Sequence, residues 1–173
     1  APGRIGEVYG IFKAYSTRVG SGPFPTELMD DEGEKMRKQG NEFGSTTGRP
    51  RRCGWIDLPS LKYSIMINGV TQLLMMKADV LSAFPVIKIC THYKLSDGTI
   101  TETLPYAIVN QKITPIYTEL PGWNTPLSGT SESGLPSKLM DYVNFLEKAL
   151  NVPISMISIG PDRTQTILRP KLG

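Results

Sequence analysis

Short apolar runs of strand length alternate along this chain with longer segments of helical periodicity, and this alternation limits the possible folds more than any other feature. The helical pattern is strongest over 136–150, because its apolar residues recur on one face: Leu139, Tyr142, Val143, Leu146 and Leu150. Strands are expected over 7–19, 70–76, 86–95, 99–104, 113–120 and 154–159, with a hairpin turn at Asp97-Gly98. Strands separated by helices predict an α/β or α+β architecture, and no linker divides the chain into independent domains.

Two more helices are predicted from their end signals. Residues 26–39 carry acids early and bases late, the polarity that the helix dipole favours, and Gly40 stops them. Asp57 can cap a second helix, which stops at Asn68-Gly69. Residues 40–55 have no hydrophobic period, so an irregular and strongly basic loop is expected there.

Composition favours a folded domain and excludes several classes of protein. The 173 residues are 39% hydrophobic and 20% charged, without the charge excess of disordered chains. A net charge of +3 is too small to indicate a nucleic-acid partner, and the apolar runs are too short to span a membrane. Cys53 and Cys90 are expected to be reduced and structural, which together with the absence of a secretory signal favours the cytoplasm.

The most basic stretch, Gly44-Ser45-Thr46-Thr47-Gly48-Arg49-Pro50-Arg51-Arg52, is the first candidate binding site. Its glycines allow close approach of a ligand to the backbone, and its threonine hydroxyls can donate hydrogen bonds. The guanidinium groups of Arg49 and Arg51 match the bidentate geometry of a carboxylate or phosphate. The stretch therefore predicts an anion site, with a solvated basic loop as the alternative.

Two strand ends carry weaker signals. In Met76-Lys77-Ala78-Asp79 the carboxylate can accept two hydrogen bonds from a guanine edge, although a strand-end charge and a helix cap are the simpler interpretation of this pattern taken alone. Residues 158–163, Ser158-Ile159-Gly160-Pro161-Asp162-Arg163, follow a buried strand, where ligand crevices often lie in α/β folds, but an ordinary turn has the same pattern.

Other residues are assigned structural roles. His92 stands alone within a predicted strand, and Trp55 and Trp123 are expected to pack rather than to stack on bases. The chain contains no Gly-Lys dipeptide, so it has no phosphate loop of the G-x-x-x-x-G-K-[ST] type and cannot transfer a phosphoryl group unaided.

Taken together, the motifs resemble the adenylosuccinate synthetase family. The resemblance covers about residues 10–169 and rests on motifs in family order: 13–20 (KAYSTRVG), 22–28 (GPFPTEL), 40–57 with its TTGRPRR core, 121–123 (PGW) and 160–164 (GPDRT). It implies a mixed-sheet α/β fold, the C-terminal part of a P-loop-type purine nucleotide ligase that lacks the N-terminal phosphate-loop half. Residues 1–173 would be one such segment.

The resemblance also implies an activity and a set of binding residues. The family uses GTP to phosphorylate the 6-oxygen of IMP, and the amino group of L-aspartate then displaces the phosphate to give adenylosuccinate. The aspartate and IMP loop would span 40–57. The implied substrate-binding residues are Val19, Ser45, Thr46, Thr47, Gly48, Arg49, Pro50 and Arg51. Those implied for GTP are Arg51, Lys77, Ala78, Asp79, Ser158, Ile159 and Gly160.

The catalytic base, the catalytic acid and the Mg²⁺ ligands of the family lie upstream of the matched motifs, so this segment would hold no catalytic residue and no metal ligand. It is expected to be inactive without the N-terminal part, and the whole enzyme is expected to be a cytoplasmic homodimer. Met76 and Ala78 depart from the family's usual Thr-Lys-Leu-Asp. The alternatives are a stand-alone guanine-nucleotide-binding module and, with less support, an RNA-binding module.

Overall fold

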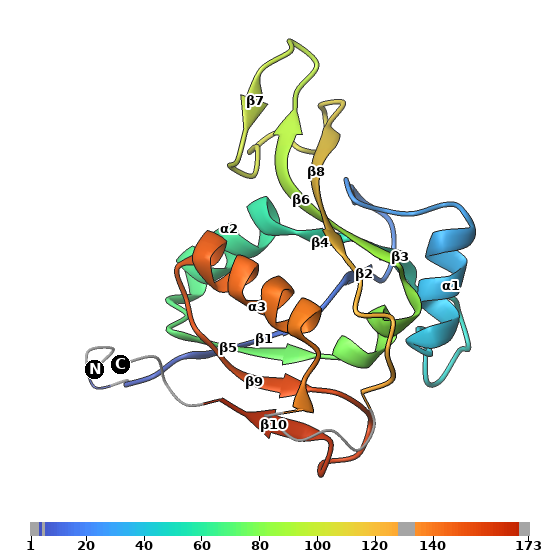
Figure 1. The fold of residues 1–173 in the computed structure, drawn as a ribbon. Helices are drawn as coiled ribbons and strands as arrows, with labels where there is room; N and C mark the ends of the chain where they lie inside the picture. Colours follow the sequence, from blue (N-terminus) through green and yellow to red (C-terminus); the bar gives the residue numbers. More distant parts are fainter. Residues whose placement is uncertain (1–3, 5, 128–133, 170–173) are drawn as a thin grey trace. The chain divides into compact units, whose positions relative to one another are not determined.

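The computed structural model describes residues 4, 6–127 and 134–169. The chain packs as two compact units, each assembled from separated stretches of sequence (Figure 1). The first unit comprises residues 1–14, 61–85 and 121–173, and the second comprises 15–60 and 86–120. That residues 1–173 form one segment of a longer enzyme stays a prediction.

The first unit is built on a four-stranded sheet in the order β1-β5-β9-β10. Its strands are β1 (Tyr9–Lys13), β5 (Gln72–Met76), β9 (Ile154–Ser158) and β10 (Thr166–Leu168). The first three are parallel, and β10 runs antiparallel to β9. This mixed sheet confirms the α/β prediction and the strands expected near 70–76 and 154–159, whereas β10 was not expected.

The helix α3 (Ser137–Leu150) covers the sheet of the first unit (Figure 1). All five residues predicted for its apolar face are buried, which confirms the helical pattern. The Tyr142 hydroxyl donates to the Ala14 carbonyl at 2.6 Å, and the Tyr142 ring lies 5.9 Å from that of Trp123. Trp123 is 4% exposed and donates from Nε1 to Ser82 Oγ, so it packs as predicted.

The second unit contains two small sheets. The first pairs β2 (Ser16–Arg18) with β3 (Arg52–Gly54), and the helix α1 (Asp31–Gln39) packs against β3. In the other, β4 (Ile56–Asp57) pairs with β6 (Val86–Lys94), which also pairs with β7 (Ile100–Thr101) and β8 (Thr114–Pro121). The predicted hairpin turn forms at Asp97-Gly98, where Gly98 has a φ of 87°.

Two predicted elements differ from the structure. The strand expected over 7–19 is divided into β1 and β2 by a bend at Ala14-Tyr15, and both of these side chains are only 1% exposed. The helix expected from Thr26 begins at Asp31, because Asp30 is the residue whose side chain accepts a hydrogen bond from Gly33 N at 3.1 Å. Burial and capping therefore placed both boundaries, and hydrophobic periodicity did not show them.

The remaining predictions concern the helix near residue 58, the cysteines and the membrane. Helix α2 (Leu58–Asn68) starts where expected, with Asp57 Oδ1 accepting from Ser60 N at 3.1 Å. Cys53 and Cys90 are both buried, and neither forms a disulfide. Within the described ranges, no helix is long and apolar enough to cross a membrane.

Candidate functional site

The basic stretch is an ordered loop with a hydrogen-bonded base. At that base Arg51 N donates to Glu42 O and Gly44 N donates to Arg49 O, each at 2.9 Å. At the tip Gly48 N donates to Gly44 O at 2.8 Å, and Gly48 has a φ of 63°, a conformation that residues with a Cβ adopt at a cost. The expectation of an irregular loop over 40–55 is therefore wrong at its base and within β3.

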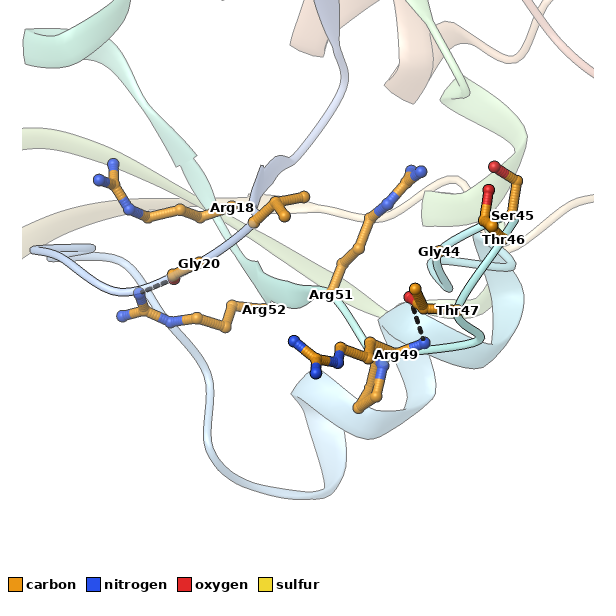
Figure 2. A pocket seen from close by; sticks show the side chains of 11 residues that line it. Arg18, Gly20, Gly44, Ser45, Thr46, Thr47, Arg49, Arg51 and Arg52 are labelled. Atoms are coloured by element: carbon orange, nitrogen blue, oxygen red, sulfur yellow. Dashed lines mark hydrogen bonds between the residues drawn. The ribbon is translucent and has the colours of Figure 1, made fainter.

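The loop encloses a pocket of about 510 Å³ within the second unit (Figure 2). Its lining contains all the substrate-binding residues predicted above except Gly48, which forms the turn. The lining residues are Arg18, Val19, Gly20, Gly44, Ser45, Thr46, Thr47, Arg49, Pro50, Arg51 and Arg52. The structure thus brings the segment around Val19 together with the threonine and arginine loop, although the two are more than twenty residues apart in sequence.

The arginines of the pocket differ in how their charge is compensated. The Arg49 guanidinium forms no hydrogen bond or ion pair with any residue that the structure describes, so all its donors remain available to an anion. Arg51 donates from Nη1 to Glu42 Oε2 at 2.9 Å. In Figure 2 the Arg51 side chain extends toward the side of Ser45 and Thr46.

Arg52 has a structural role in the pocket wall. Its guanidinium forms a bidentate pair with Glu27, at 2.8 and 2.5 Å, and donates to the carbonyls of Gly20 and Gly22 at 3.1 and 2.9 Å. The hydrogen bond to Glu27 raises the pKa of Arg52 above its ordinary value. Arg52 therefore fixes the backbone next to Val19, and four of its five N–H donors already have protein acceptors. Figure 2 shows the bond to Gly20.

The second candidate site lies in the first unit, where β5 ends. Lys77 has φ 60° and ψ 38°, a left-handed conformation that is costly for a residue with a side chain. The chain then enters the 3-10 helix η2 (Ala78–Ala83), which contains Asp79. Asp79 Oδ1 is buried without a hydrogen-bond partner among the described residues, and burial raises the pKa of the Asp79 carboxyl despite its own backbone N–H and the Lys77 charge.

Ser158, Ile159 and Gly160 follow β9, which is the parallel neighbour of β5. Both strand ends therefore lie at one edge of the sheet, and η2 contacts β9. The Ser158 hydroxyl donates to the Gly160 carbonyl at 3.0 Å. A Cβ at Gly160 would lie 2.3 Å from Gln165 Oε1, so a side chain there would require the end of the Gln165 side chain to move.

A buried polar network in the second unit has no local motif that would have indicated it. The Tyr93 hydroxyl donates between the two Asp57 oxygens, at 2.5 and 2.6 Å, and lies 3.3 Å from Ser60 Oγ. Burial raises the pKa of Asp57, and burial beside Asp57 raises the pKa of the Cys90 thiol to about 12. These groups tie the cap of α2 to β6 and lie outside the pocket lining.

His92 lies in β6 with Nδ1 3.0 Å from Thr91 Oγ1. No group of three or more His, Cys, Asp and Glu side chains able to hold a metal ion occurs in the part of the chain that the structure describes. That His92 takes no part in chemistry stays a prediction.

Fold and sites define a mixed α/β segment with an arginine-lined pocket in one unit. In the other unit a half-buried carboxylate lies at a sheet edge, with one buried oxygen that has no partner among the described residues. The chain belongs to the adenylosuccinate synthetase family, whose model matches residues 1–167. It is 62% identical to adenylosuccinate synthetase of Cytophaga hutchinsonii and 58% identical to that of Bacteroides thetaiotaomicron, over 98% of this chain in each case.

A solved structure of fully ligated adenylosuccinate synthetase from Plasmodium falciparum is similar to this chain, with a TM-score of 0.90 and 37% identity over 96% of it. The match covers 40% of that structure and 39% of the Cytophaga hutchinsonii protein. The chain therefore spans about two-fifths of the length of the relatives it matches.

Proposed function

We propose that this segment supplies the binding sites for L-aspartate, the IMP ribose and guanine in a ligase that joins IMP to aspartate with hydrolysis of GTP. The observation that carries the proposal is the pocket in which Val19 and the Ser45–Arg51 loop come together around the unpaired guanidinium of Arg49. Family membership supports the same reaction. The complete protein would be a cytoplasmic homodimer.

In the pocket, the chemistry of the lining residues suits a small dicarboxylate. Arg49 and the remaining donors of Arg51 can each bind a carboxylate, while the Thr46 and Thr47 hydroxyls can donate to its other oxygens. A dicarboxylate held at both ends has a fixed amino group, which is the positioning that a bimolecular displacement requires. Arg49 and the Val19 backbone would also contact the ribose of IMP.

At the sheet edge, Asp79 suits the guanine of GTP. Guanine presents a ring N–H and an exocyclic amine side by side, and the unsatisfied Oδ1 can accept from one while Oδ2 accepts from the other. The Lys77 stem, Ala78 and residues Ser158–Gly160 would form the rest of the base pocket. Bound GTP would supply the phosphoryl group and Mg²⁺ would neutralise phosphate charge, with residues for both steps outside this segment.

The test is a full-length chimera in which this segment replaces the 170 matched residues of the Cytophaga hutchinsonii protein. We expect the chimera to form adenylosuccinate from IMP, aspartate and GTP, and the isolated 173 residues to form none. An inactive chimera that is folded would contradict the proposal. Adenylosuccinate formation by the isolated segment would contradict only its proposed dependence on the rest of the enzyme.

The unpartnered Oδ1 of Asp79 also favours one alternative, a module that binds guanine nucleotides without catalysis. Titration of the isolated chain with GTP and with ATP tests this alternative, since the module must prefer GTP. Equal binding of the two nucleotides would reject it.

A further inference from the structure

Glu42 is bonded to the arginine loop but is not one of the residues that line the pocket. Glu42 is fully buried, at 0% exposure. Its Oε1 accepts from the Tyr15 hydroxyl at 2.6 Å and its Oε2 accepts from Arg51 Nη1 at 2.9 Å. The three side chains form a relay that begins at the buried Tyr15 and Glu42 and ends on Arg51, a partly exposed arginine of the pocket.

We propose that Glu42, held by Tyr15, is a positioning residue that fixes the Arg51 guanidinium for its ligand. A buried carboxylate must be paired. Here its partner is Arg51, and the pairing fixes the orientation of the otherwise flexible Arg51 guanidinium. Nη1 is used by Glu42, while the other guanidinium donors of Arg51 make no hydrogen bond to a described residue and remain for the pocket. The inference rests on the proposed function, because it concerns what Arg51 binds.

The backbone around Glu42 and Arg51 restricts the same two residues. Arg51 N donates to Glu42 O, and Arg37 Nε donates to Arg51 O, both at 2.9 Å. Glu42 N donates to Arg37 O at 2.9 Å, which ties the relay to the end of α1. Main chain and side chain of Arg51 are thus held together, so little conformational freedom is left to lose when a ligand binds.

Close packing supports the relay from the other side. A Cβ at Gly40 would lie 2.3 Å from the Tyr15 hydroxyl oxygen and 3.1 Å from Glu42 Cγ. Gly40 has a φ of −81°, so its backbone conformation does not require glycine and the contact with Tyr15 does. The hydroxyl of Tyr15 therefore occupies a site with no room to move toward α1.

The test measures KM for aspartate and kcat in the chimera carrying Glu42→Gln, Tyr15→Phe, Arg51→Leu or the Glu42→Gln/Arg51→Leu pair. Glu42→Gln keeps the shape and removes the charge, so we expect KM for aspartate to rise about tenfold with kcat changed less than about twofold. Tyr15→Phe should raise it about threefold. In the Arg51→Leu background, Glu42→Gln should add nothing, because its effect acts through Arg51.

Tyr93→Phe is the matched control, since it also removes a buried hydroxyl that donates to a buried carboxylate of the second unit. It should lower stability and leave KM for aspartate unchanged. If Glu42→Gln does not fold, Tyr15→Phe against Tyr93→Phe still decides, because equal KM values would reject the relay. A large effect of Arg51→Leu with none of Glu42→Gln or Tyr15→Phe rejects the inference alone, as does an additive double variant. No effect of Arg51→Leu on KM for aspartate rejects the proposed binding role of Arg51 and the inference with it.

Discussion

The arginine pocket and the carboxylate at the sheet edge are prepared for ligands in opposite ways. In the pocket, Arg51 is already paired with a buried Glu42, and Arg52 is held by Glu27 and two backbone carbonyls. At the sheet edge, Asp79 has a buried oxygen with no partner among the described residues, and burial raises its pKa. Arg51 and Arg52 are thus paired in the absence of a ligand, whereas Asp79 carries an acceptor with no partner among the described residues.

This difference has an energetic consequence. Removal of a group from a paired network leaves its partner buried and unsatisfied, which costs stability. Removal of the charge from a buried group without a partner relieves its desolvation, so the expected cost is weaker ligand binding and not lower stability. Substitution of a paired group should therefore lower stability, whereas substitution of an unpaired group should weaken binding without lowering stability.

The largest effect is expected for Asp79→Asn on the use of GTP. The amide cannot accept from both guanine N–H groups, so we expect a loss of about 3 kcal/mol, roughly a hundredfold rise in KM for GTP. Initial rates of the chimera at saturating IMP and aspartate measure it. Inosine triphosphate lacks the exocyclic amine, so the variant should also lose the preference for GTP over this analogue.

A change confined to KM for aspartate in Asp79→Asn would contradict the assignment of guanine to this edge. The control is Asp162→Asn, which changes an exposed carboxylate in the turn after β9. This carboxylate accepts from Thr164 Oγ1 at 2.7 Å and from Thr164 N at 2.8 Å, and both hydrogen bonds lower its pKa. Asp162→Asn should leave KM for GTP within about twofold, since the Asp162 carboxylate accepts only from Thr164 of the same turn among the described residues.

The next effect is expected at Arg49, the unpaired arginine of the pocket. Arg49→Leu should cost about 2 kcal/mol of aspartate binding, roughly a thirtyfold rise in KM, and Arg49→Lys about half of that because the bidentate geometry is lost. Thermal midpoints should not change, since the guanidinium has no partner among the described residues to leave behind. A fall in stability with unchanged KM would show that Arg49, like the paired Arg51, holds the loop together and does not bind aspartate.

Sequence alone identified the residues that line the pocket better than the residues that hold them in place. The glycines, threonines and arginines of 44–52 lie within one loop, so their shared chemistry is visible as a local motif. Glu42 and Tyr15 are 27 positions apart, and Asp57 and Tyr93 are 36 apart. No hydrophobic period links such pairs, because they meet only through tertiary packing.

The same contrast between local patterns and tertiary packing holds for the prediction of the fold. Helix α3 was predicted to within one residue, because a single apolar face determines it. The strand β10 was missed because three residues with one buried side chain, Ile167, carry too little periodicity. The bend at Ala14-Tyr15 also escaped, since it separates two stretches with the same alternation.

A third prediction uses the Asp57–Tyr93 network as a paired site with no ligand. Tyr93→Phe removes the donor held between the two Asp57 oxygens and leaves that carboxylate buried, so stability should fall by about 2 kcal/mol. Urea unfolding of the chimera measures the loss. An unchanged midpoint would show that pairing within the second unit contributes little, and the contrast with Asp79 would then disappear.

The smallest effect is the one in which the two kinds of site should differ in sign. Because the folded-state pKa of Asp79 is raised, its ionised form opposes folding, and stability is lost as pH rises from the ordinary value near 3.8 through the folded pKa. Asp79→Asn should therefore increase the free energy of unfolding at pH 7, by under about 1 kcal/mol once solvent screening is allowed for, and so raise the thermal midpoint. Below the ordinary pKa the variant and the parent chain should have the same midpoint. Thermal melts of both proteins across this pH range measure the difference. A lower midpoint for the variant at pH 7 would mean that Asp79 is already satisfied in the absence of GTP, and the distinction between the two sites would fail.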